Sequence, residues 1–76
     1  MKKEIHIGKK IKEVLKSQGR TATWFSQELP CDRSNLYHIF NNDSINTRQL
    51  LRISDILNYD FFLWISEESK MNDENI

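Results

Sequence analysis

The sequence predicts an all-α fold, a compact domain of five short helices, and three observations support this. Apolar residues recur at helical spacing through most of residues 7–65. Residue types that begin or end helices separate these stretches. A chain of 76 residues has room for one small core with mostly local connections. We expect a short N-terminal arm at 1–6, a helical domain at 7–66 and an acidic flexible tail at 67–76.

The first helix is expected over residues 7–17, with apolar residues on one side and lysines on the other. Gly19 is placed to end it in a left-handed turn. Thr21 is a suitable N-cap for a second helix. The packed face of that helix is expected to hold Ala22, Phe25, Ser26 and Leu29.

The second and third helices meet at a tight corner. Pro30 disfavours helical backbone in the residue before it, and Asp32 can cap a new helix that starts at Arg33. Leu36, Ile39 and Phe40 are expected to point inward. The outer side then carries only hydrogen-bonding groups without a carboxylate, a surface suited to reading base edges: Arg33, Ser34, Tyr37, His38 and Asn41.

Turn-forming residues at 41–44 precede a fourth helix, for which Asn46 and Gln49 match a capping box. Asn58 can stop this helix in the left-handed region. Its apolar residues cover so much of the circumference that it is expected to be the most buried helix: Leu50, Leu51, Ile53, Ile56 and Leu57.

A short fifth helix is expected over residues 61–65, capped by Asp60, with fraying beyond Ser66. Its five consecutive apolar residues cannot all face one core, because side chains turn by about 100° per residue. Either an aromatic residue stays exposed, or the run contacts a second subunit; we favour the homodimer. A strand that pairs with residues 4–7 is the remaining alternative. The predicted dimer contacts are Phe61, Phe62, Trp64 and Ile65.

The net charge is zero, but its distribution is uneven. Residues 1–52 hold ten Lys and Arg against five acids, a balance of 10 − 5 = +5, and residues 53–76 hold one against six, a balance of −5. A bipolar chain can present a basic face to a polyanion. The single cysteine and the lack of a signal-like or membrane-spanning stretch predict a soluble, cytoplasmic protein.

No catalytic constellation and no metal-ligand spacing is present in the sequence. His6 and His38 are isolated, and Cys31 stands where a buried apolar group is expected. We therefore expect a protein that is not an enzyme and needs no metal or cofactor.

Residues 7–65 resemble the lambda-repressor and Cro-like (XRE-type) helix-turn-helix family of DNA-binding regulators. The opening stretch 7–11, Ile-Gly-Lys-Lys-Ile, and the phrase at 50–59 are similar to the first and closing helices of that family. The chain departs from the family at Ala22, where a phosphate-binding glutamine is usual, and at Pro30, where glycine is usual. The bihelical motif is matched at six positions: Phe25, Ser26, Leu29, Cys31, Leu36 and Ile39.

The resemblance implies a transcriptional regulator that binds double-stranded DNA as a homodimer, with the third helix in the major groove. By position, the base contacts are Arg33, Ser34, Tyr37 and His38. The implied phosphate contacts are Arg20, Thr21, Thr23, Asn42, Asn46, Thr47 and Arg48. The alternative is a protein-interaction module that keeps the fold without binding DNA, favoured by the neutral charge, Ala22, Pro30 and the aromatic run.

Overall fold

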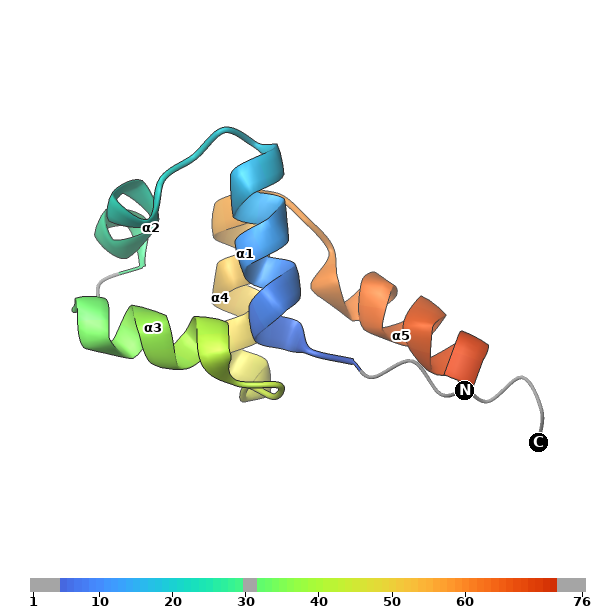
Figure 1. The fold of residues 1–76 in the computed structure, drawn as a ribbon. Helices are drawn as coiled ribbons and strands as arrows, with labels where there is room; N and C mark the ends of the chain where they lie inside the picture. Colours follow the sequence, from blue (N-terminus) through green and yellow to red (C-terminus); the bar gives the residue numbers. More distant parts are fainter. Residues whose placement is uncertain (1–4, 30–31, 73–76) are drawn as a thin grey trace.

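The computed structural model of the chain describes residues 5–29 and 32–72, which form five helices and no strand (Figure 1). The predicted all-α class is confirmed, and a strand at residues 61–65 is excluded. None of the described helices is both long and apolar enough to cross a membrane. The helices are α1 Ile7–Ser17, α2 Ala22–Glu28, α3 Arg33–Asn41, α4 Thr47–Leu57 and α5 Phe61–Asn72.

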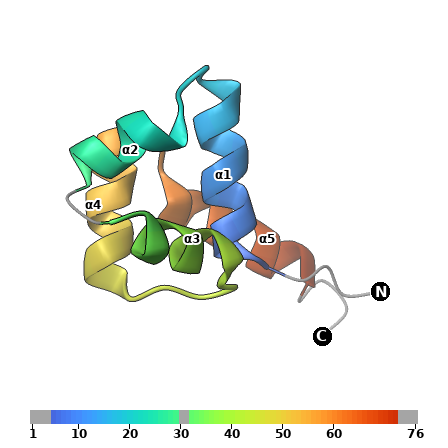
Figure 2. The same ribbon diagram turned by 60° about the vertical axis from the view of Figure 1, so that its left-hand side comes forward.

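In Figure 1, α1 and α4 run through the middle of the molecule, with α2 and α3 on one side and α5 on the other, and Figure 2 shows that α1 and α4 are set apart from each other. The longest dimension is 42 Å, against 23 and 22 Å for the other two, because α5 projects from the body. The helix-turn-helix candidates α2 and α3 are therefore on the opposite side of the molecule from α5.

Every helix begins with the same device, a side chain that accepts a hydrogen bond from the backbone N–H three residues later. The predicted caps Thr21, Asp32, Asn46 and Asp60 are confirmed, with donor–acceptor distances of 3.1, 2.9, 2.8 and 3.0 Å. His6 caps α1 through its Nδ1, 3.1 Å from the backbone nitrogen of Lys9, a role that was not predicted from the sequence.

The ends of α1 and α4 also follow the prediction. Gly19 and Asn58 have φ angles of 70° and 50°, in the left-handed region. Just after each of them, Arg20 and Tyr59 donate their backbone N–H groups to carbonyls of the preceding helical turn, at 3.1 Å in both cases. The predicted end of the fifth helix is wrong, since α5 continues to Asn72 rather than stopping near residue 65.

The core is apolar and draws on all five helices. Its aromatic centre is Phe25 against Phe40, with ring centroids 6.3 Å apart. Two predicted inward positions are wrong: Ala22 is exposed, and Leu51 is 54% exposed on α4. The helix with the most buried residues is α1 rather than α4. The buried residues are Ile7, Ile11, Val14, Leu15, Phe25, Leu29, Leu36, Ile39, Phe40, Leu50, Ile53, Leu57 and Phe61.

Helix α1 starts directly against the end of α3. The backbone N–H of Gly8 donates to the carbonyl of Asn42 at 3.0 Å, and that of Ile7 donates to Asp43 at 3.3 Å. A Cβ atom at Gly8 would lie 2.3 Å from the carbonyl oxygen of Phe40 and 2.4 Å from that of Ile39. Only glycine fits here without moving one of the two helices.

We predict that Gly8→Ala lowers the free energy of unfolding by about 2–3 kcal/mol, because backbone atoms block the added methyl group. Gly19→Ala is the matched control: its site is open, and only the left-handed backbone opposes it, at a cost of about 1–2 kcal/mol. Urea unfolding followed by circular dichroism measures both. Since alanine is the better helix former, an unchanged or more stable Gly8→Ala protein would contradict the close contact.

Candidate nucleic-acid interface

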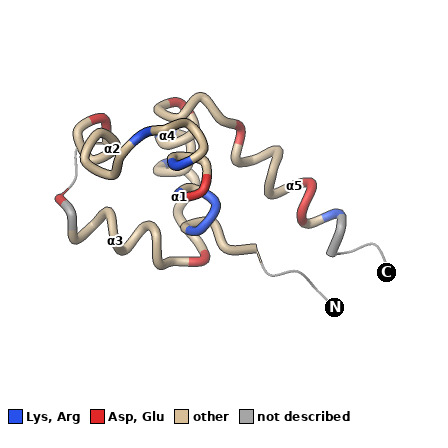
Figure 3. The backbone as a smooth tube through the Cα atoms, turned by 45° about the horizontal axis from the view of Figure 1, so that its top comes forward, with Lys and Arg blue, Asp and Glu red and all other residues tan. Residues whose placement is uncertain are grey.

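The outward face of α3 is polar and carries no carboxylate. Leu36, Ile39 and Phe40 turn into the core, which fixes the rotation of the helix. The acids nearest to α3 in sequence lie just beyond its two ends, at Asp32 and Asp43 (Figure 3). The structure describes Arg33 as the first residue of α3 but not the position of its side chain. The exposed side chains of α3 are Ser34, Asn35, Tyr37, His38 and Asn41.

A polar depression of about 440 Å³ separates α3 from the start of α4. The loop after α3 runs back along this helix to the start of α4 (Figure 2), and the depression is lined from α3, this loop and the first turn of α4. Its polar lining consists of amide, imidazole and hydroxyl groups, which can donate and accept hydrogen bonds. The lining residues are Asn35, His38, Ile39, Asn42, Ser44, Ile45, Asn46 and Gln49. We call this depression the α3/α4 groove.

The α3/α4 groove brings together residues that the sequence analysis assigned to two different roles. His38 was a predicted base contact, whereas Asn42 and Asn46 were predicted phosphate contacts, and all three line it. Asn35 and Gln49 also line it and were missed. The spacing could have indicated them: Asn35 lies three positions before His38, and Gln49 lies three positions after Asn46.

Thr47 and Arg48 are exposed on the first turn of α4, next to the groove. Tyr37 is 58% exposed, and Ser34 is also exposed on α3. Thr21 and Thr23 are exposed at the start of α2. These residues are therefore accessible to a large partner.

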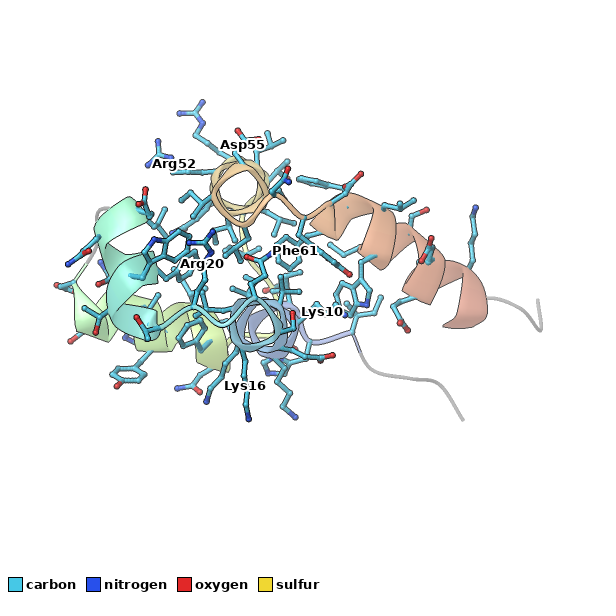
Figure 4. All side chains as sticks on the ribbon, turned by 90° about the horizontal axis from the view of Figure 1, so that it is seen from above. Lys10, Lys16, Arg20, Arg52, Asp55 and Phe61 are labelled. Carbon is cyan, nitrogen blue, oxygen red and sulfur yellow. The ribbon has the colours of Figure 1, made fainter. Side chains whose placement is uncertain are left out.

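Arg20 is separated from the α3/α4 groove. Its guanidinium carbon lies 4.0 Å from the centre of the Trp24 ring, a cation–π stack. The residue lines a depression with Ile56, Leu57 and Asn58 at the end of α4, and Figure 4 shows it between α2 and α4. The structure thus places this predicted phosphate contact beside the far end of α4, away from its first turn.

Lys10 differs from the other lysines of α1. Its ammonium group lies 5.6 Å from the ring centre of Tyr59 and 5.4 Å from that of Trp64, and 3.8 Å from a carboxylate oxygen of Glu13. Its side chain is only 19% exposed. Lys10 therefore connects α1 to α5, while Lys9, Lys12 and Lys16 remain exposed.

The predicted dimer contacts on α5 have different surroundings. Phe61 is fully buried in the core of its own domain, so it is wrong as a contact with a second copy. Phe62, Trp64 and Ile65 are partly buried against that core. Leu63, which the prediction left out, is 56% exposed.

Pro30, where the sequence departs from the helix-turn-helix pattern, and Cys31, where it fits that pattern, both lie outside the described residues. Within the described part of the chain, no group of three or more His, Cys, Asp or Glu side chains is arranged to hold a metal ion.

Comparisons with protein-family models, curated proteins and solved structures found no match to this chain.

We predict that Asp32→Ala lowers the free energy of unfolding by about 1 kcal/mol, because α3 loses the acceptor for the N–H of Asn35. Asp32→Asn keeps an acceptor oxygen and is expected to change stability by only a few tenths of a kcal/mol. Thermal unfolding measures both variants. Equal losses in the two would show that the carboxylate charge, and not the cap hydrogen bond, stabilises the start of α3.

Proposed function

We propose that this protein is a sequence-specific DNA-binding transcriptional regulator that inserts α3 into the major groove. The observation that carries the proposal is the exposed, carboxylate-free face of α3 beside the first turn of α4. A major groove about 12 Å wide admits one helix, and its base edges offer hydrogen-bond donors and acceptors. The residues assigned to the bases are Arg33, Ser34, Tyr37 and His38.

We also propose that the five helices have the lambda-repressor and Cro-like arrangement. In support, α2 and α3 are consecutive short helices in contact, and α1 packs on α3 through its glycine. In that arrangement the first turn of α4 and the start of α2 approach the two phosphate backbones beside α3. Asn42, Asn46, Thr47 and Arg48 then bind phosphate on one side, and Thr21 and Thr23 on the other. Arg20 contributes only if it leaves Trp24.

The proposed DNA complex is a homodimer associated through α5. The support is the apolar surface that the domain leaves uncovered there, where Leu63 is exposed beside the partly buried Phe62. A symmetric pair would read a two-fold operator with half-sites about one helical turn apart.

The second candidate function is a protein-interaction module. Leu51 and Leu63 are both more than half exposed, and the net charge is zero; both features favour a protein partner. Binding to random duplex DNA separates the two functions.

We predict that the protein binds random duplex DNA with a logarithm of affinity that falls linearly with the logarithm of salt concentration. Arg48→Gln should make this slope less steep by about one unit, as expected for the loss of one phosphate contact. Lys70→Gln removes the same charge at the far end of α5 and should leave the slope unchanged. Absence of binding at low salt would reject the DNA function and favour the interaction module.

We predict that Leu63→Glu weakens self-association at least about tenfold, equivalent to about 1.4 kcal/mol, because a charge would enter the apolar contact. Tyr37→Glu, at a similarly exposed residue of α3 on the opposite side of the molecule, is the control and should leave the association unchanged. Sedimentation equilibrium measures all three proteins. Wild-type protein that stays monomeric at high concentration would reject the dimer.

A further inference from the structure

A second depression, of about 380 Å³, lies between the end of α1 and the start of α2. Its wall is mostly apolar, in contrast to the α3/α4 groove, and it includes the buried side chains of Leu15 and Phe40. Ala22 and Gly19 complete the floor and contribute little or no side-chain volume. We call it the α1/α2 pocket. It is lined by Lys12, Leu15, Lys16, Gly19, Arg20, Ala22 and Phe40.

The charged groups at the α1/α2 pocket all have the same sign. Lys12 and Lys16 are exposed one turn apart on α1, where like charges repel each other. Arg20 adds a third positive charge, although its guanidinium is stacked on Trp24. None of the described residues that line the pocket is acidic, and Glu13, the acid nearest in sequence, pairs with Lys10. An anion at this pocket would relieve the repulsion between the lysines.

The space in the pocket follows from the small residues at the junction of α1 and α2. Ala22, the first residue of α2, has only a methyl side chain. A Cβ atom at Gly19 would meet no atom within 4 Å, so the space beside Gly19 is open. A longer side chain at Ala22 would occupy this space. Lys16, which also lines the pocket, is exposed and extends outward from α1 in Figure 4.

We propose that the α1/α2 pocket binds a small amphipathic organic anion, an aromatic or medium-chain carboxylate. Its apolar part lies against Leu15, Ala22 and Phe40, and its carboxylate lies between Lys12 and Lys16. Small-molecule sites of this size combine an apolar wall with a few polar groups that orient the ligand. Charge-assisted hydrogen bonds from lysine suit a carboxylate. The site does not depend on DNA binding, but its occupant would contact α1, α2 and α3 together.

The test is a titration with 2-naphthoate, followed by the backbone amide signals in two-dimensional NMR. We expect saturable shifts centred on Leu15, Gly19, Ala22 and Phe40. The uncharged analogue 2-naphthamide has nearly the same shape and should bind about tenfold more weakly, because it lacks the charge-assisted bonds. Equal affinities for the two compounds would overturn the proposal.

Two variants locate the site. Lys12→Gln/Lys16→Gln keeps the aliphatic stems and should remove the preference for naphthoate over naphthamide. Ala22→Leu fills the pocket and should abolish the binding of both compounds, with the helix content checked by circular dichroism. Lys9→Gln removes one positive charge outside the pocket and should preserve binding.

A second probe distinguishes the ligand class. Inorganic phosphate carries charge without an apolar part and should produce much smaller shifts than naphthoate at the same concentration. Phosphate that binds as tightly as naphthoate would show a simple anion site, and naphthoate binding that survives Ala22→Leu would place the site elsewhere. Either result would overturn the proposal.

Discussion

The structure depends on the close approach of α1 to the end of α3 at Gly8. The N–H groups of Ile7 and Gly8 would be unpaired at the start of an isolated helix, and here they meet carbonyls of Asp43 and Asn42. The chain just after α3 therefore satisfies two N–H groups at the start of α1. The missing Cβ brings the backbones within a distance that any other residue would prevent. This contact sets the direction in which the chain leaves α3, and so it helps to place the first turn of α4 beside His38 in the α3/α4 groove.

Much of the fold could be predicted because the residues that begin and end its helices act on their near neighbours in the sequence. A helix N-cap needs only a side chain that can accept a hydrogen bond from the backbone N–H three residues later. A left-handed turn needs only a residue that tolerates positive φ. Errors arose where burial depends on distant elements. Ala22 has helical spacing with Phe25 and Leu29, but no element covers that side of the short α2. The end of α5 lost its apolar periodicity after residue 65, yet good helix formers such as Glu67 and Lys70 continue it.

The sequence indicated which types of residue would form the candidate site, but it did not indicate which of those residues would lie next to one another. Charge counting treated every lysine and arginine of residues 1–52 as available to a polyanion. In the fold, two of these cations form cation–π contacts: Lys10 lies over Tyr59 and Trp64, and Arg20 lies over Trp24. These pairings join residues far apart in the sequence or depend on the rotation of α2, so no local pattern reveals them. Lys10 in particular, with a side chain only 19% exposed, is less accessible to a polyanion than the sequence balance of +5 implies.

The chemistry of the α3/α4 groove gives a further reason why a second copy would matter. In the proposed DNA complex, its amides, hydroxyl and imidazole would contact DNA by directional hydrogen bonds, and such contacts release few condensed counterions. Such contacts orient a helix well but supply little of the sequence-independent affinity that lysine-rich surfaces provide. A domain that recognises DNA in this way gains affinity by linking two half-sites, because the second contact becomes intramolecular. Leu63 is exposed on α5, on the opposite side of the molecule from α3, so the proposed dimer through this surface would leave the α3/α4 groove of each copy uncovered.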